Sequence, residues 1–233
     1  MIDESFRGTV VLFAVEREAK PFLRSCRDAR AISSDRWLCD KGRLLVEIVG
    51  VGKPSARSNV EALLATGCRP QQIIVAGFAG ALRGGLAVGD VIVAAEVVDE
   101  SGGRWPTTWP DERNGRVLTT DRMIGEPALK TELGIKHAAD IVEMESSAVA
   151  EVCVRHGIPF GCVRVVSDDV SKPLSKRLMG LVESGRVRII RVLWEVLRSP
   201  GMGIELVRLA KQTRMAAEKL TARLNALLAR FPS

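Results

Sequence analysis

Gln72-Ile73-Ile74-Val75-Ala76 is a mostly apolar run with three β-branched residues, and the glycine-containing stretch Gly77-Phe78-Ala79-Gly80 follows it. Continuous apolar runs of this kind are typical of strands that are buried on both faces of a sheet. Glycine at the end of a strand allows a close approach of backbone or ligand. The stretch therefore predicts a buried strand at residues 72–76 whose carboxyl end lies at a ligand-binding edge.

Further apolar runs along the chain predict more strands, and helical patterns separate them. We expect strands at residues 9–15, 44–49, 90–95, 139–143 and 161–166, helices at about 18–23, 55–65, 146–156, 186–197 and 204–230, and a loop at 99–115. This alternation predicts an α/β fold, a single domain over residues 1–233 with a central mixed, mostly parallel twisted sheet flanked by helices on both faces. In such sheets ligands bind beyond the carboxyl ends of the strands.

Composition narrows the function classes. A hydrophobic content of 46% supports a buried core and argues against a disordered chain. The cysteines are odd in number and lack CxxC spacing, which argues against a disulfide framework and a structural zinc site; they are Cys26, Cys39, Cys68, Cys153 and Cys162. No apolar run approaches the ~18 residues of a membrane-spanning helix, so we expect a cytoplasmic protein. The cysteine pattern leads us to expect no metal ion.

The positive charge is concentrated at the C-terminal end. Residues 171–233 hold 13 Lys and Arg against 4 Asp and Glu, whereas residues 1–170 hold 21 basic and 24 acidic residues. A nucleic-acid-binding protein usually carries its basic patch on the body that reads the ligand, so this distribution argues against one. The basic C-terminal helices, about 186–230, carry a leucine stripe (Leu209, Leu220, Leu224, Leu227 and Leu228) that either packs on the domain or touches anionic lipid.

Two common enzyme motifs are missing. Gly50-Val51-Gly52-Lys53 resembles part of a phosphate-binding loop, but Glu47 and Pro54 occupy positions where that motif needs glycine and serine or threonine. His137 and His156 have no nucleophile motif near them, which argues against a hydrolase triad.

Three acidic clusters each follow a predicted strand: Glu16-Arg17-Glu18, Glu143-Met144-Glu145 and Asp168-Asp169. Acidic residues also favour helix N-termini, because the first amides and the helix dipole attract them. Three clusters that converge on one edge of a sheet nevertheless favour general acid–base chemistry, which needs carboxylates in different environments.

An ordered set of segments resembles a known family. Val142-Glu143-Met144-Glu145-Ser146-Ser147-Ala148-Val149-Ala150, followed by Ile158-Pro159-Phe160, Arg164 and Val166-Ser167-Asp168, resembles the signature of methylthioadenosine/S-adenosylhomocysteine nucleosidases. Gly77-Phe78-Ala79-Gly80 with Val88-Gly89-Asp90-Val91, and the Gly50-Val51-Gly52-Lys53 turn, resemble further segments of the same nucleoside phosphorylase and nucleosidase superfamily. The likeness spans about residues 9–170.

The resemblance implies a role for each matching residue. Asp168 matches the general acid that protonates N7 of the purine, and Ser167 steadies it. Glu145 matches the carboxylate that binds the ribose hydroxyls. Glu18 matches the carboxylate that activates water in the hydrolytic enzymes. The remaining predicted contacts are Glu143, Met144, Phe78, Met123, Ile124 and Val51 at the substrate and Arg164 as an anchor of the site.

Two departures bear on the substrate. Phe78 stands where the nucleosidases carry a small polar residue near the sugar, and Met123 stands where they stack a phenylalanine on adenine. The segment from Thr120 to Ile124 and the basic C-terminal helices resemble hopanoid-associated phosphorylases, which act on an adenosyl-lipid.

The resemblance implies cleavage of a purine nucleoside, with adenine as the base, and no cofactor. Water is favoured as the nucleophile because Glu18 would repel phosphate, although Arg17, Arg83 and Arg122 could form a phosphate site. A non-catalytic nucleoside-binding protein is the alternative from another class. The superfamily likeness further implies a homodimer or larger homo-oligomer.

Overall fold

The computed structural model describes residues 6–108, 114–171 and 200–230, the last of these as backbone only up to residue 211. The strands are β1 (Thr9–Phe13), β2 (Arg30–Ser33), β3 (Arg36–Cys39), β4 (Leu44–Ile48), β5 (Gln72–Ala81), β6 (Val91–Asp99), β7 (Arg104–Pro106), β8 (Gly115–Thr119), β9 (Ile141–Glu143) and β10 (Phe160–Asp168). The helices are α1 (Glu16–Ser25), the 3₁₀ turn η1 (Asp40–Gly42), α2 (Lys53–Ala65), α3 (Pro127–His137), α4 (Ser146–His156) and α7 (Pro200–Leu228).

The strands form one mixed sheet, as the sequence predicts. Its strand order is β10-β6-β8-β9-β5-β1-β4-β3-β2, and β10 also pairs with β5. The run β4-β1-β5-β10 is parallel throughout. The antiparallel pairs are β2–β3, β3–β4, β5–β9, β6–β7 and β6–β10. The carboxyl ends of β1, β5 and β10 therefore meet at one edge.

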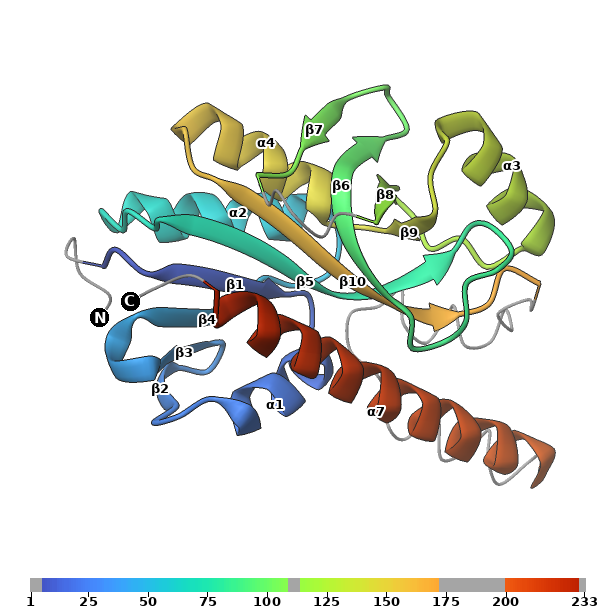
Figure 1. Cartoon of the computed structure of the whole chain (residues 1–233), viewed down its shortest axis with the longest axis horizontal. Helices are drawn as coiled ribbons and strands as arrows, with labels where there is room; N and C mark the ends of the chain where they lie inside the picture. Colours follow the sequence, from blue (N-terminus) through green and yellow to red (C-terminus); the bar gives the residue numbers. More distant parts are fainter. Residues whose placement is uncertain (1–5, 109–113, 172–199, 231–233) are drawn as a thin grey trace.

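Helices cover both faces of this sheet (Figure 1). Side chains of β1 alternate between the faces, since Val10 and Leu12 pack in the cluster that α2 and α4 cover, while Val11 and Phe13 pack in the cluster that α1 and α7 cover. A third cluster around Leu118 joins α3 to β8 and β9. Because these strands are buried on both faces, their sequences are continuously apolar.

The C-terminal helix α7 confirms the prediction for residues 204–230 and begins four residues earlier. Leu220, Leu224 and Leu227 of its stripe are buried with Phe22 of α1. This part of the helix therefore packs on the sheet. The predicted helix at 186–197 lies outside the described residues, and so does the side chain of Leu209. None of the helices in the described part of the chain has the length and hydropathy needed to cross a membrane.

The sequence did not predict every element. Residues 99–115, predicted as a loop, contain β7, which pairs with β6 through Val97 and Trp105. The β2–β3 hairpin, β8 and α3 were also missed. β2 is largely exposed, so it lacks the apolar run of the buried strands and depends on pairing with its neighbour.

Candidate active site

The carboxyl half of β5 forms the centre of the predicted site. The amide of Phe78 donates to Glu18 Oε1 at 2.8 Å, and the carbonyl of Ala79 accepts from Ser167 Oγ at 3.2 Å. A Cβ atom on Gly80 would lie 3.0 Å from Asp168 Oδ2. The backbone of this one strand therefore contacts residues from both α1 and β10.

Glu18 lies in the first turn of α1 and is buried. Its Oε2 accepts from the amides of Ala14 and Val15 at 3.2 and 3.3 Å, so it caps its own helix. The other oxygen reaches β5. Glu18 therefore has both of the roles that the sequence left open, a helix-terminus residue and a member of the carboxylate cluster.

Arg164 is the cation of this cluster and is 1% exposed. Its Nη2 donates to Glu143 Oε2 in a short ion pair, donates to Ser146 Oγ at 2.9 Å, and lies 3.5 Å from Glu145 Oε2. Figure 1 places its strand, β10, next to β5. The prediction that Arg164 anchors the site agrees with these contacts.

Glu143 is held more tightly than the other acids. Thr119 Oγ1 donates to its Oε1 at 2.5 Å, and the amides of Glu145 and Ser146 both donate to its Oε2 at 2.9 Å. With Arg164 added, every lone-pair direction of this carboxylate has a donor nearby. Glu143 is therefore a structural anion that fixes the start of α4.

Glu145 reaches across to the N-terminus of α2. Its Oε1 accepts from the amide of Gly52 at 2.9 Å. Gly52 is the N-cap of α2 and has φ +87°, a conformation that side chains with a Cβ rarely adopt. The glycine turn after β4 thus presents its amide to a carboxylate that lies 93 residues further along the chain.

Buried Glu18 and Glu145 lie near one guanidinium, and burial is the main cause of the shift in the pKa of each. Burial raises the pKa of Glu18, and Arg164 and the backbone donors lower it only in part. Burial, followed by the negative charge of Glu143, raises the pKa of Glu145 to about 8. Burial lowers the pKa of Arg164, but Glu143 and the other anions outweigh this and raise it overall. The raised pKa values make Glu18 and Glu145 stronger proton acceptors than ordinary carboxylates.

Asp168 lies at the end of β10 and is partly exposed. Ser167 Oγ donates to its Oδ1 at 2.7 Å. The ammonium of Lys130, from α3, forms a short ion pair with its Oδ2 and also donates to the carbonyl of Asp169 at 3.2 Å. The predicted neighbour Ser167 is therefore in contact, and a lysine that the sequence analysis did not select is the main partner.

The predicted apolar contacts are placed less closely. Phe78 and Met144 are half-buried, and the amide of Phe78 donates to Glu18. Val51 is half-buried in the glycine turn before α2. Ile124 is buried in the cluster around Leu118, and Met123 is half-buried beside it in sequence. The contacts in the structure do not bring either of these last two residues to the carboxylates.

Two residues of the site were missed. Lys130 is three residues before buried Leu133, so a lysine on the apolar face of a helical pattern was the available signal. Thr119 ends β8, a strand that was not predicted, so its contact with Glu143 had no signal in the sequence.

Gly77 is required by the close approach of Glu18 and Arg164. A Cβ at this position would lie 2.7 Å from Arg164 Nη1 and 2.9 Å from Glu18 Oε1. We expect Gly77→Ala to cost about 1–3 kcal/mol of unfolding free energy, because overpacking displaces both charged groups. Urea denaturation measures this loss. Gly84→Ala is the control, since nothing lies within 4 Å of its Cβ; equal losses in both variants would contradict the argument.

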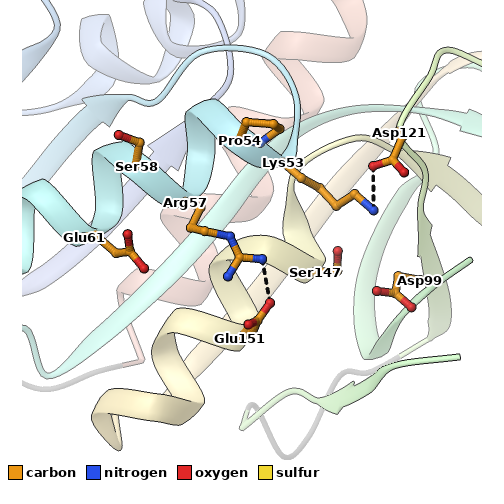
Figure 2. Close-up of a pocket in the computed structure, with 9 residues that line it drawn as sticks. All are labelled: Lys53, Pro54, Arg57, Ser58, Glu61, Asp99, Asp121, Ser147 and Glu151. Atoms are coloured by element: carbon orange, nitrogen blue, oxygen red, sulfur yellow. Dashed lines mark hydrogen bonds and ion pairs between the residues drawn. The ribbon is translucent and has the colours of Figure 1, made fainter. Parts of the chain in front are cut away.

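A cavity of about 480 Å³ lies beside the cluster, between α2 and α4 (Figure 2). Two ion pairs line it: Lys53 Nζ lies 2.7 Å from Asp121 Oδ1, and Arg57 Nη2 lies 2.6 Å from Glu151 Oε2. Glu18, Glu145 and Asp168 do not line it. The cavity is therefore distinct from the carboxylate cluster.

Within residues 6–108, 114–171 and 200–230, no group of three or more His, Cys, Asp or Glu is arranged to hold a metal ion. The carboxylates of Glu143 and Glu145 instead form ion pairs with the guanidinium of Arg164.

Solved structures of similar shape are nucleoside-cleaving enzymes by name. The 5′-methylthioadenosine/S-adenosylhomocysteine nucleosidase of Helicobacter pylori superposes with a TM-score of 0.69 at 17% identity, covering 97% of this chain and 99% of that one. The futalosine hydrolase of Helicobacter pylori gives the same values. At this identity the likeness shows the fold.

Sequence comparison shows the family. A 5′-methylthioadenosine/S-adenosylhomocysteine nucleosidase from Bacillus cereus is 30% identical over 158 residues, which cover 53% of this chain and 67% of the relative. The sequence model of the phosphorylase superfamily matches residues 10–114 and 110–198. These segments include the glycine stretch of β5, the carboxylates of α1 and β9, and the end of β10, and the chain belongs to the phosphorylase superfamily.

Proposed function

We propose that this protein cleaves the N-glycosidic bond of a purine nucleoside, with adenine as the base and water as the nucleophile. One observation carries the proposal: buried Glu18 and Glu145 share Arg164 on one side of the β5 backbone, and Asp168 lies at the end of the neighbouring strand. A pair of proton-exchanging carboxylates at the sugar and a separate acid at the base are what this bond cleavage needs.

The base departs with the electrons of the bond between C1′ and N9. Protonation of N7 neutralises the charge that develops on the purine, and Asp168 is the group we assign to this transfer. Ser167 holds one of its oxygens at 2.7 Å, so the carboxylate is fixed in orientation. Asp168 is less buried than the carboxylate cluster, which leaves it open to a base at the strand end.

The sugar becomes cationic as the bond breaks. Glu145 is the group we assign to the ribose hydroxyls, because one of its oxygens is held by Gly52 and the other is only 3.5 Å from Arg164. When it is ionised, Glu145 can make a charge-assisted hydrogen bond to a hydroxyl, which contributes roughly 1.5–3 kcal/mol. That interaction strengthens as positive charge grows on the sugar.

Glu18 is the group we assign to the attacking water. Burial raises its pKa, which makes the ionised carboxylate a stronger base toward water. A phosphate dianion bound here would lie close to the carboxyl groups of Glu18, Glu143 and Glu145. Arg83, one of the arginines that could offset the repulsion, is already paired with Asp140. Hydrolysis is therefore favoured over phosphorolysis.

The names of the relatives support this assignment. The Bacillus cereus and Helicobacter pylori proteins are nucleosidases of 5′-methylthioadenosine and S-adenosylhomocysteine. Phe78 and Met123 depart from that family's pattern, so an adenosyl-lipid, cleaved by phosphate, is the second candidate.

The test is incubation of the purified protein with adenosine, methylthioadenosine and an adenosyl-lipid, with and without phosphate, while free adenine is followed. We expect adenine to appear without phosphate. A strict requirement for phosphate, with ribose 1-phosphate or its 5′-substituted form as product, would establish phosphorolysis. No cleavage of any of the three would refute the proposed function.

Glu18→Gln gives a sharper test of the nucleophile. The amide cannot accept a proton from water, so we expect turnover to fall by ~10²-fold or more while KM changes little. Steady-state rates and substrate binding by calorimetry separate the two effects. Glu16→Gln is the control, because Glu16 lies on the same helix turn and is exposed. Unchanged turnover in Glu18→Gln would remove Glu18 from the mechanism.

A further inference from the structure

Two cysteines lie together at the end of α1 that is opposite Glu18. Cys26 is the C-cap of α1, and Cys39 is the last residue of β3. Cys39 is buried in the apolar cluster that α1 and α7 cover, and half-buried Cys26 packs against the same cluster. Both thiols are free. The fold therefore brings together two cysteines that are 13 residues apart in the chain.

Backbone hydrogen bonds hold the two cysteine segments side by side. The amide of Asp40 donates to the carbonyl of Arg27 at 3.2 Å, so the residues that directly follow the two cysteines are bonded to each other. The carboxylate of Asp28 accepts from the amides of Asp40 and Lys41 at 2.7 and 2.9 Å. These bonds fix the separation of the two backbones, on which the closure of a disulfide depends.

The two thiols also contact each other. A hydrogen bond between them raises the pKa of Cys26, which donates, and lowers the pKa of Cys39, which accepts. The negative charges of Asp28 and Asp40 act against ionisation of either thiol. Because a cysteine side chain is short, two thiols can be in contact only where their backbones are close. The pair is therefore near the geometry of a disulfide, in which the Cα atoms are about 4.4–6.8 Å apart.

The other three cysteines lack this arrangement. Cys68, Cys153 and Cys162 are each 0% exposed. Burial raises the pKa of all three thiols, that of Cys153 to about 12. Reaction at a cysteine needs the thiolate and access to it. Of the five cysteines, all of which lie in the described part of the chain, Cys26 is the one that is not fully buried.

We propose that Cys26 and Cys39 are a site of reversible modification, a dithiol that a small disulfide such as oxidised glutathione closes into a disulfide between α1 and β3. This inference does not depend on the proposed function.

The exchange has two steps. Cys26 first loses its proton to solvent, and its sulfur attacks one sulfur of the small disulfide, whose S–S bond breaks and releases one thiolate. Cys39 then loses its proton to solvent, and its sulfur attacks the sulfur of Cys26, so that the mixed S–S bond breaks and releases the second thiolate. Both released thiolates take up a proton from solvent. The two cysteines are oxidised, and the small disulfide is reduced to two thiols.

The test treats the folded wild-type protein with excess oxidised glutathione at about pH 8.5, near the pKa of an ordinary thiol. Mass spectrometry of the alkylated and digested protein then maps the products. We expect one disulfide, between Cys26 and Cys39, which dithiothreitol reverses, while the other three cysteines stay reduced. Because the bond closes a loop in the unfolded chain, we expect the oxidised protein to unfold at a higher urea concentration than the reduced protein.

Two variants separate the roles of the two thiols. Cys39→Ser removes the thiol that completes the exchange, so we expect glutathione to remain on Cys26 as a mixed disulfide. Cys26→Ser leaves only buried thiols, so we expect little uptake of glutathione while the protein is folded. Thermal unfolding checks that each variant is folded. Wild-type protein unfolded in urea is the control, since all five of its thiols should react.

Three results would overturn the inference. They are glutathione that remains on Cys26 of the wild type, a disulfide that joins any other pair, and a folded wild type that stays reduced where the unfolded protein reacts. A lower urea midpoint of the oxidised protein would also overturn it, because the bond would then strain the fold. Adenine release by the reduced protein tests the proposed function separately.

Discussion

Replacement of Asp168 by Asn is expected to lower purine release by at least ~10²-fold. The amide keeps the size of the side chain and can still accept from Lys130, but it cannot pass a proton to N7. Most of the loss should appear in kcat, because the interaction matters in the transition state rather than in substrate binding. Release of free adenine under saturating substrate measures it, with thermal unfolding as the check on folding.

Asp169→Asn is the matched control for this prediction. Asp169 follows directly in the chain. Its side chain accepts from the amide and hydroxyl of Ser171, and its carbonyl accepts from Lys130. We expect this variant to retain near-normal turnover. Comparable losses in the two variants would show that the strand end, and not the Asp168 carboxylate, is what matters.

Replacement of Arg164 by Met is expected to have the largest effect on stability. It removes the only guanidinium that contacts buried Glu143 and Glu145 in the described part of the chain. Removal of one partner from a buried ion pair costs about 3–5 kcal/mol, because the remaining charge is left without compensation. Urea denaturation at neutral pH measures the loss.

The pH dependence of this variant gives a second measurement. Without Arg164 the folded-state pKa values of Glu18 and Glu145, which are already raised, rise further above their unfolded values of about 4.3. The folded state then binds more protons than the unfolded state, so stability is greatest at low pH and is lost as pH rises through the folded values. Since the pKa of Glu145 is already about 8 in the intact cluster, the variant should be relatively more stable at pH 5 than at pH 8.

Arg57→Met is the control for Arg164→Met. Arg57 pairs with Glu151 at 2.6 Å, but the two side chains are 37% and 42% exposed. Exposed pairs contribute about 0–1 kcal/mol, because solvent screens them. A loss in Arg57→Met as large as that in Arg164→Met would contradict the view that burial sets the difference.

The buried strands were predicted well because burial on both faces leaves a strong local signal. The run from Gln72 to Ala76 is the first half of β5, and the predicted helix at 146–156 has the bounds of α4. The strand itself continues through Gly80 to Ala81, since pairing with β10 extends it past the glycines. Pairing of this kind is not local, so the sequence pattern stopped at the first glycine.

The residues of the site also fall into two groups, those with a local signal in the sequence and those that only the tertiary structure brings to the site. The acidic clusters were visible because they follow apolar strands, and the family resemblance assigned Glu18, Glu145 and Asp168. Their partners were less visible, because Arg164 meets Glu145 only after β9 and β10 join the same sheet, and Lys130 reaches Asp168 from a helix that was not predicted.

By itself the sequence determined the α/β class, the buried strands and the residue types at the strand ends, because hydrophobic pattern and glycine positions are local properties of the chain. Only the tertiary structure decided which carboxylates share Arg164, that Gly77 leaves room for this contact, and that Lys130 stands behind Asp168. The physical reason is that the charge state of a buried group depends on the solvent it loses and the ions it meets, and both are set by residues far away in the chain.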